Sequence, residues 1–195
     1  MVRMTRMFVA IVAALIFVAS TYAVGGNYTV IGTPEQEGVV RGALDISRYD
    51  WSRVPHVTIR IVPELVNEAE AVPGEIRVRA DILNYGRASW GTIQHEYAHQ
   101  VDFFLMTDAM RVEAMRFFGL SVWHDPTLPH DRQAAELFAS TLAWVYWPSV
   151  KNLMRRETRG DPRAFQAMLA RWGLADPPPP ICVRVKITTH RQMEL

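Results

Sequence analysis

The segment His95-Glu96-Tyr97-Ala98-His99 constrains the fold of this chain more than any other part of its sequence. On an α-helix, residues four apart lie on the same face, so His95 and His99 can bind one zinc ion together. Glu96 is then placed to act as a general base toward a metal-bound water. The H-E-x-x-H pattern therefore predicts a helix with a metal site on one face. The alternative is an exposed helical turn that carries these side chains without a metal.

A helix from Ser89, which can cap it, to about Met106 is predicted around this motif. Its apolar side chains have helical spacing and form one stripe: Ile93, Tyr97, Val101, Phe104 and Leu105. The histidines and glutamate of the motif fall with Asp102 on another face. We therefore expect an amphipathic helix with a buried back and a metal site at its front.

A catalytic zinc site usually has a third protein ligand. A third histidine on the same helix is excluded, because Asp102 and Leu105 stand where the pattern H-E-x-x-H-x-x-G-x-x-H has its glycine and last histidine. The best remaining candidate is Glu136, because small and apolar neighbours make a carboxylate unfavourable there unless something pairs with it. The alternative places Glu136 on the solvent side of its helix. The weaker candidates are Glu113, Asp125 and Asp131.

Three more side chains are candidates for roles beside the metal. Asp102 can accept a hydrogen bond from the second ring nitrogen of a ligand histidine, or it can pair with a nearby arginine. His130 and His124 lie in the loop before the helix of Glu136, and either can donate a hydrogen bond to an oxyanion. His130 is the stronger catalytic candidate, and the alternative for each is an exposed loop histidine.

The N-terminal segment 1–23 is predicted to direct export. Arg3 and Arg6 precede an uncharged apolar run at 7–19, and small residues before a cut after Ala23 complete the pattern of a secretory signal peptide. The apolar run is short for a membrane span, and the alternative is an uncleaved anchor that tethers the chain to a membrane. Either interpretation places the rest of the chain outside the cytoplasm, secreted or extracytoplasmic.

Composition predicts one globular domain at 24–176, followed by a Pro-rich spacer and tail at 177–195 with a weak strand pattern at 181–187. The chain has 195 residues, 49% of them hydrophobic, and a net charge of +1, which gives no indication of nucleic-acid binding. The single cysteine, Cys182, cannot form an internal disulfide. We expect a monomer.

The order of the predicted elements indicates an α+β fold. Helices are predicted at 34–46, 89–106, 108–118, 132–147 and 162–172, with N-caps at Thr33, Ser89, Asp131 and Asp161, and a strand at 56–62. The segment 75–80 alternates charged and apolar residues and is interpreted as an edge strand. Its Arg77 and Arg79 are either solvated side chains or part of an edge that binds an extended substrate, with a preference for acidic residues.

The sequence H-E-Y-A-H-Q-V-D at 95–102, followed by A-E-L-F-A at 135–139, resembles the gluzincin metallopeptidases, and most of all the small catalytic domains similar to anthrax lethal factor. The resemblance covers about residues 55–150. It implies a zincin-like domain in which a short twisted mixed sheet has an edge strand packed against the active-site helix, followed by a helical part. It also implies zinc ligands at His95, His99 and Glu136, with Glu96 as the base.

The chain departs from that family at two places. Ala98 replaces a glycine often found before the second histidine. Where the family has a tyrosine that stabilises the oxyanion, this chain has Leu128-Pro129-His130, which leaves that role open, with His130 as its candidate.

These observations predict a secreted or membrane-tethered zinc-dependent endopeptidase acting on a peptide or protein substrate. The alternatives are an inactive binding module that retains a metalloprotease fold and a toxin-like effector. The intact Glu96 argues against an inactive module, since such a module has no use for the base, while the missing tyrosine argues weakly for one.

Overall fold

A computed structural model describes residues 26–179 of the chain. The predicted signal or anchor segment 1–23, Cys182 and the strand predicted at 181–187 lie outside the described residues. Within the part that the structure describes, no helix combines the length and apolar character needed to cross a membrane.

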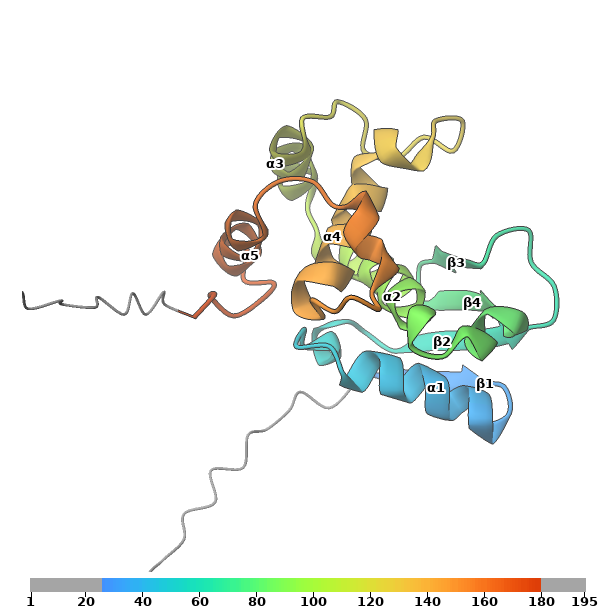
Figure 1. The fold of residues 1–195 in the computed structure, drawn as a ribbon. Coiled ribbons are helices and arrows are strands. Elements are labelled where there is room, and N and C mark those ends of the chain that lie inside the picture. The colour runs from blue at the N-terminus through green and yellow to red at the C-terminus, as the bar shows by residue number, and fades with distance from the viewer. Residues whose placement is uncertain (1–25, 180–195) are drawn as a thin grey trace, which may run out of the picture.

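Four short strands form one mixed sheet in the order β1-β2-β4-β3 (Figure 1). Their bounds are Tyr28–Ile31 for β1, Val57–Val62 for β2, Ala69–Val72 for β3 and Glu75–Arg79 for β4. β2 runs parallel to both β1 and β4, whereas β3 runs antiparallel to β4. With the helices described below, the chain is a mixed α+β protein, as its sequence predicts.

The prediction that 75–80 forms the edge strand is wrong. β4 lies between β2 and β3, so the edge strand on this side of the sheet is β3. The segment between β2 and β4 contains β3, which has only four residues and lacks a β-branched run. Its pairing depends on β4: Glu70 lies opposite Arg77, and Arg77 donates to its carboxylate at 3.2 Å. Two of the charges that indicated an edge, Glu75 and Arg77, therefore form cross-strand ion pairs on the open face of an inner strand, with Arg60 of β2 and Glu70 of β3.

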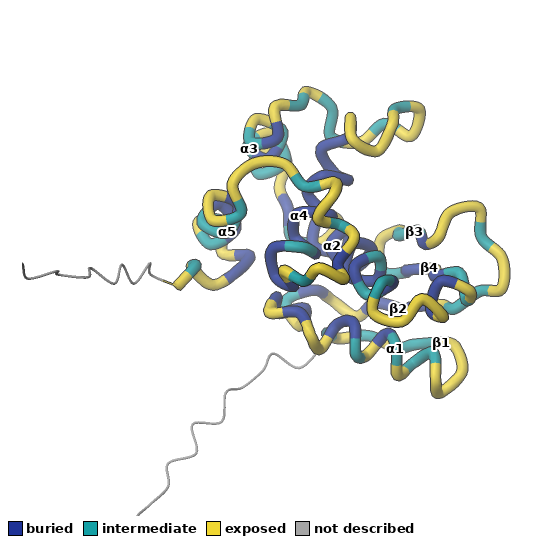
Figure 2. The backbone as a smooth tube through the Cα atoms, in the orientation of Figure 1, coloured by how far each residue is buried: buried dark blue, intermediate teal, exposed yellow. Residues whose placement is uncertain are grey.

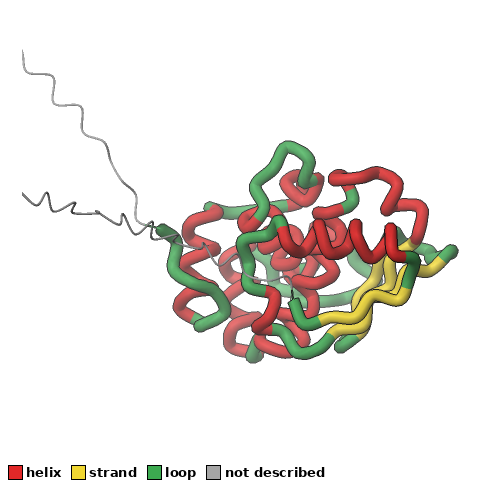
Figure 3. The backbone as a smooth tube through the Cα atoms, turned by 90° about the horizontal axis from the view of Figure 1, so that it is seen from below, coloured by secondary structure: helices red, strands yellow, loops and turns green. Residues whose placement is uncertain are grey.

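Among the described residues, helices cover only one face of the sheet. Ile59, Ile76 and Val78 are buried beneath the helices, while Arg60 and Arg77 lie exposed on the other face. Figure 3 shows the helices on one side of the strands. This alternation follows from the two-residue period of a strand.

Five α-helices complete the fold of residues 26–179. Their bounds are Pro34–Asp45 for α1, Trp90–Leu105 for α2, Asp108–Phe118 for α3, Ala134–Tyr146 for α4 and Pro162–Arg171 for α5. The predicted N-caps at Thr33 and Asp161 are confirmed by their side-chain hydrogen bonds, and Thr33 forms a capping box with Gln36. Ser89 stands at the N-cap of α2, but its hydroxyl donates to the carbonyl of Gly86 and does not cap the helix.

The helix of Glu136 begins later than predicted. Asp131 is not its cap, because His130–Arg132 form a separate 3₁₀ turn, η3, and α4 begins after Gln133. Another 3₁₀ segment, η4, spans Leu153–Glu157 and returns to α4. Both segments border the site described below.

The motif helix α2 lies at the centre of the molecule (Figure 2). Sheet and α1 cover one side, and α4 covers another (Figure 1). Ile93, Tyr97 and Val101 of the predicted stripe are fully buried, but Phe104 is 41% exposed. The helix is therefore buried nearly all round along its first three turns and is not the simple amphipathic helix that the stripe predicts.

Candidate metal centre

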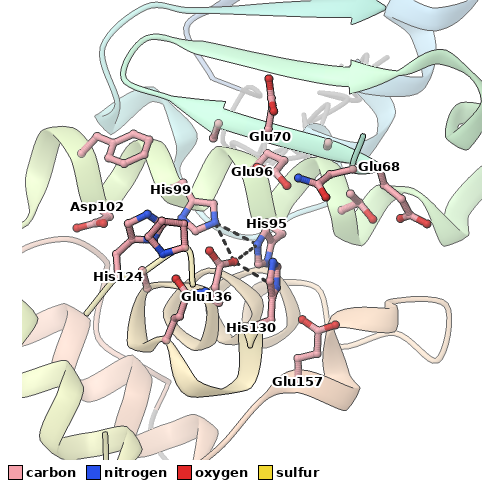
Figure 4. Close-up of a pocket in the computed structure, with 18 of the residues that line it drawn as sticks. Glu68, Glu70, His95, Glu96, His99, Asp102, His124, His130, Glu136 and Glu157 are labelled. Atoms are coloured by element: carbon pink, nitrogen blue, oxygen red, sulfur yellow. Dashed lines mark hydrogen bonds and ion pairs between the residues drawn. The ribbon is translucent and has the colours of Figure 1, made fainter. Parts of the chain in front are cut away.

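Three side chains from two helices converge on one point. His95 and His99 extend from α2 and Glu136 from the first turn of α4, with their polar ends together (Figure 4). Nε2 of His95 lies 3.1 Å from Nε2 of His99 and 3.1 Å from Oε2 of Glu136. Nε2 of His99 lies 3.4 Å from the same oxygen. All three residues are buried, and together they could hold a metal ion.

The spacing of these atoms matches a tetrahedral site. An ion with bonds of about 2.1 Å holds its ligand atoms about 3.4 Å apart. The three observed separations are 3.1, 3.1 and 3.4 Å. Two imidazole nitrogens that face each other at this distance are favourable only if a proton or a cation lies between them. The donor set therefore fits a metal ion bound by two imidazoles and one carboxylate.

Residues between and beside the two histidines set the rotation of α2. Tyr97, inside the motif, points away from the metal site and packs its ring 5.2 Å from that of Trp51. Gln94 donates to the carbonyl of Ala43 at 2.6 Å, which ties α2 to α1. Gln100 accepts from Gly74 N–H at 2.8 Å, next to the β3–β4 turn. These contacts on the back and flanks of α2 direct both histidines toward α4.

Contacts within this group of side chains shift the pKa values of its members. Burial acts to raise the pKa of the Glu136 carboxyl, but the hydrogen bonds from His95 and His99 outweigh it and hold that pKa far below its usual range. Burial acts in the opposite direction on His95, yet the bond to Glu136 and the charge of Glu96 leave the pKa of His95 raised. Glu136 is therefore an anion held by imidazoles, which is the protonation state that a metal ligand needs.

Glu96 lies beside this group without being part of it. It is 7% exposed, and Figure 4 shows it on the side of the ligands toward Glu70 of β3. Burial, the largest cause, raises the pKa of the Glu96 carboxyl. A buried carboxyl of this kind can take up and release a proton nearer neutral pH than a solvated one.

His130 and His124 both line the pocket around the ligands. Nδ1 of His130 lies 3.5 Å from Oε2 of Glu136, and its ring stacks on that of His95 with centroids 6.3 Å apart. The side chain of His130 is 68% exposed. It therefore stands at the open rim of the site, while α2 and α4 form the floor.

The loop that carries these two histidines is closed by Gln133. The buried Gln133 side chain accepts from Asp125 N–H at 3.2 Å and donates to the carbonyl of Leu128 at 2.9 Å. Backbone bonds from Ala134 to Val122 and from Ala135 to Trp123 join the two ends of the loop. Nothing in the local sequence pattern indicates this role for Gln133, because the partners are brought together by the loop.

Asp102 pairs with an arginine, the second of the two predicted roles. Arg111 of α3 donates to one carboxylate oxygen at 2.7 Å, and the indole N–H of Trp123 donates to the other at 2.9 Å. Asp102 thus joins α2 to α3 and to the start of the loop. Neither bond goes to a ligand histidine.

The weaker ligand candidates lie elsewhere. Glu113 binds Arg171 and the indole of Trp172, which joins α3 to α5. Asp125 accepts from Thr127 within the loop, at 2.9 Å from its N–H. Asp131 accepts from Arg159 through its carboxylate at 3.5 Å and through its backbone carbonyl at 2.9 Å. Each carboxylate has a structural partner of its own, and none joins the metal group.

The three candidate metal ligands line a pocket of about 1250 Å³. It is bordered by Val66 to Ala71 around β3 on one side, by the loop of His124 and His130 on another, and by Met154 and Glu157 of η4. Comparisons of the chain with protein-family models, with curated proteins and with solved structures found no match.

Proposed function

We propose that the chain is a zinc-dependent endopeptidase with a gluzincin-type site, secreted or tethered to a membrane by its N-terminal segment. The observation that carries this proposal is the convergence of His95, His99 and Glu136 at tetrahedral spacing in a buried position. Two nitrogen ligands and one carboxylate are the ligand set of several catalytic zinc sites. The base that such a site needs, Glu96, stands beside the ligands.

Zinc, when bound, would acidify a water molecule and polarise a carbonyl oxygen. The chain's own residues would do the rest. Glu96 would accept the proton of the attacking water and pass it to the leaving amine, a task for which its raised pKa is suited. His130, at the exposed rim of the pocket, would donate a hydrogen bond to the developing oxyanion, in place of the tyrosine of the similar family.

A peptide substrate would lie along β3. This strand has no partner on its outer side among the described residues, and the segment 66–71 borders the pocket of the ligands. An extended peptide can add there as a further strand. Arg77 and Arg79 do not support a preference for acidic substrates, because Glu75 and Asp81 accept hydrogen bonds from them.

An inactive metal-binding module is the second candidate, and the retained Glu96 disfavours it. Such a module would need the three ligands but not a buried carboxyl beside them, which has to be desolvated at a cost in stability. The two functions differ in what happens when Glu96 alone is changed.

The test compares the purified full chain with its Glu96→Gln variant. We expect one zinc per chain in both proteins, and cleavage of casein or a peptide library by the wild type that a chelator abolishes. Removal of the base should lower kcat by about 10²-fold or more at unchanged zinc content. A protein without stoichiometric zinc contradicts the proposal, and so does equal cleavage by the wild type and Glu96→Gln. Zinc binding without cleavage by either protein favours the binding module.

Glu136→Ala tests the third ligand separately. Loss of the carboxylate leaves two imidazoles, so zinc occupancy in a dialysed sample should fall well below that of the wild type. Glu113→Ala is the matched control, because Glu113 is a residue of α3 that bonds to the end of α5 and does not line the pocket. Full zinc occupancy in Glu136→Ala would place the third ligand elsewhere.

A further inference from the structure

The ring nitrogen of His95 that does not face the ligand group has a buried partner. Nδ1 of His95 lies 3.0 Å from Oγ of Ser140, which is fully buried. Oγ of Ser140 in turn donates to Oε2 of Glu157 at 3.0 Å. Three side chains from α2, α4 and η4 thus form a hydrogen-bonded row that ends on the first histidine of the motif.

The carboxylate determines the direction of the hydrogen bonds in this row. A serine hydroxyl has one proton, and a carboxylate accepts it far better than the thioether of Met154, which lies 3.7 Å away. Once the hydroxyl donates to Glu157, it can only accept from His95. Nδ1 of His95 then carries a proton of its own, so a bound metal ion would displace only the proton of Nε2 and would find there the lone pair that a metal ligand requires.

The face of α4 toward the site provides two different groups for this ring. Glu136 and Ser140 are four residues apart and therefore lie on the same side of α4. Oε2 of Glu136 lies 3.1 Å from Nε2 of His95, and Oγ of Ser140 lies 3.0 Å from Nδ1. One helical turn thus holds the imidazole from both of its nitrogens.

Glu157 reaches Ser140 because η4 is bound tightly to the two helices. The buried Asn152, just before η4, donates to the carbonyls of Ala143 and Trp147 at the end of α4, at 3.0 and 3.1 Å. Its amide oxygen caps η4 by accepting from Met154 N–H at 3.1 Å. Gly91 of α2 leaves the space for this approach, since a Cβ there would overlap the amide of Asn152.

We infer that Ser140 and Glu157 are positioning residues of the metal site: Glu157 orients the Ser140 hydroxyl, and the hydroxyl holds the His95 ring with Nε2 toward the metal. The inference rests on the proposed function in taking this group as a metal site. It assigns roles to two residues outside the H-E-x-x-H motif, one of them on the 3₁₀ segment at the pocket border.

The zinc dissociation constant of the full chain tests the inference, measured by competition with a chromophoric chelator at one pH. Loss of a hydrogen bond to a ligand's outer nitrogen typically weakens metal binding by about 10- to 100-fold, and we expect this for Ser140→Ala. Glu157→Ala should weaken it by about 10-fold. Glu157→Gln should recover most of that loss, because the amide oxygen still accepts from the hydroxyl.

Glu68→Ala is the matched control for charge. Glu68 is exposed, borders the same pocket and is also an acidic residue, but no described hydrogen bond joins its side chain to His95 or Ser140 (Figure 4). Its variant should bind zinc nearly as well as the wild type. In the zinc-loaded wild type we also expect a ring N–H resonance of His95 that exchanges slowly with water, and that exchanges fast in Ser140→Ala.

The outcomes separate the inference from the proposed function. Equal losses in Glu157→Ala and Glu68→Ala would show that Glu157 acts by charge alone and would overturn the inference. Wild-type affinity in Ser140→Ala would overturn it as well. A wild type that binds no zinc contradicts the proposed function instead. Should Ser140→Ala fail to fold, the variants of Glu157, which is exposed, still test the inference.

Discussion

Two buried tyrosines in the core differ in one hydrogen bond. Tyr49 and Tyr146 pack edge to face with ring centroids 5.1 Å apart. The Tyr49 hydroxyl donates to the carbonyl of Leu174 at 2.9 Å, whereas the Tyr146 hydroxyl is buried without a partner among the described residues. Burial also raises the pKa of Tyr146 to about 12. An unpaired buried hydroxyl costs free energy, so the two oxygens should contribute to stability with opposite signs.

The substitutions Tyr49→Phe and Tyr146→Phe remove one oxygen each and keep both rings. Tyr49→Phe should lower the free energy of unfolding by about 1–2 kcal/mol, because it leaves the Leu174 carbonyl unpaired. Tyr146→Phe should leave it unchanged or raise it by up to about 1 kcal/mol. Urea unfolding followed by circular dichroism measures both. Equal destabilisation by the two changes would mean that the Tyr146 hydroxyl does have a partner.

The sequence predicts single residues well where local geometry places them. His95 and His99 are neighbours on any helix, and Glu136 is conspicuous as a carboxylate among apolar residues. Ser140 and Gln133 could not be found in this way, because their partners are brought to them by a 3₁₀ segment and a loop. A serine one helical turn after a ligand indicates a role at the metal site only once the structure shows that a ligand histidine turns a ring nitrogen toward it.

Segments that depend on contacts distant in sequence were the least predictable elements. Local signals predict four elements with bounds close to those in the structure: the caps and periodicity of α1, α3 and α5, and the β-branched alternation of β2. β3 is too short to have a pattern of its own, and it forms because β4 lies beside it. For this reason the sequence pattern predicts the sheet edge at 75–80, whereas the edge strand in the structure is β3.

Two helical glycines differ in the space that surrounds them, because η4 approaches α2 closely at one of them. A Cβ on Gly91 would overlap Asn152, so Gly91→Ala should lower the free energy of unfolding by about 1–3 kcal/mol and loosen η4. A Cβ on Gly38 of α1 meets nothing within 4 Å, so Gly38→Ala should raise it by about 0.5–1 kcal/mol. Chemical denaturation of both variants checks the pair, and a stabilising Gly91→Ala would contradict the packing described.

At the scale of the molecule, the candidate site joins the two most buried helices. His95 and His99 belong to α2, and Glu136 follows more than 35 residues later on α4. An ion at this point would hold together segments that are far apart in the unfolded chain. Such an ion binds the folded state in preference to the unfolded one, so it stabilises the fold in proportion to its occupancy.

Removal of the metal should therefore lower the melting temperature of the full chain. At free zinc about 1,000 times the dissociation constant, the stabilisation is about 4 kcal/mol, or roughly 10 °C for a domain of this size. Calorimetry with zinc and with a chelator measures the shift. Glu136→Ala is the control and should show a much smaller shift between the two buffers, because it binds zinc more weakly. An equally large shift in that variant would show that zinc acts at another place.

The closure of the loop at 123–133 has a consequence for how fast the proposed peptide substrate would bind. Gln133 bonds to the backbone inside the loop, Trp123 donates to Asp102, and backbone hydrogen bonds join the two ends of the loop. The rim of the pocket is therefore ordered before anything binds. Ordering a free loop costs about 1–2 kcal/mol of backbone entropy per residue, and that cost is met on folding here. Association would then be limited by diffusion and orientation, without a gating step.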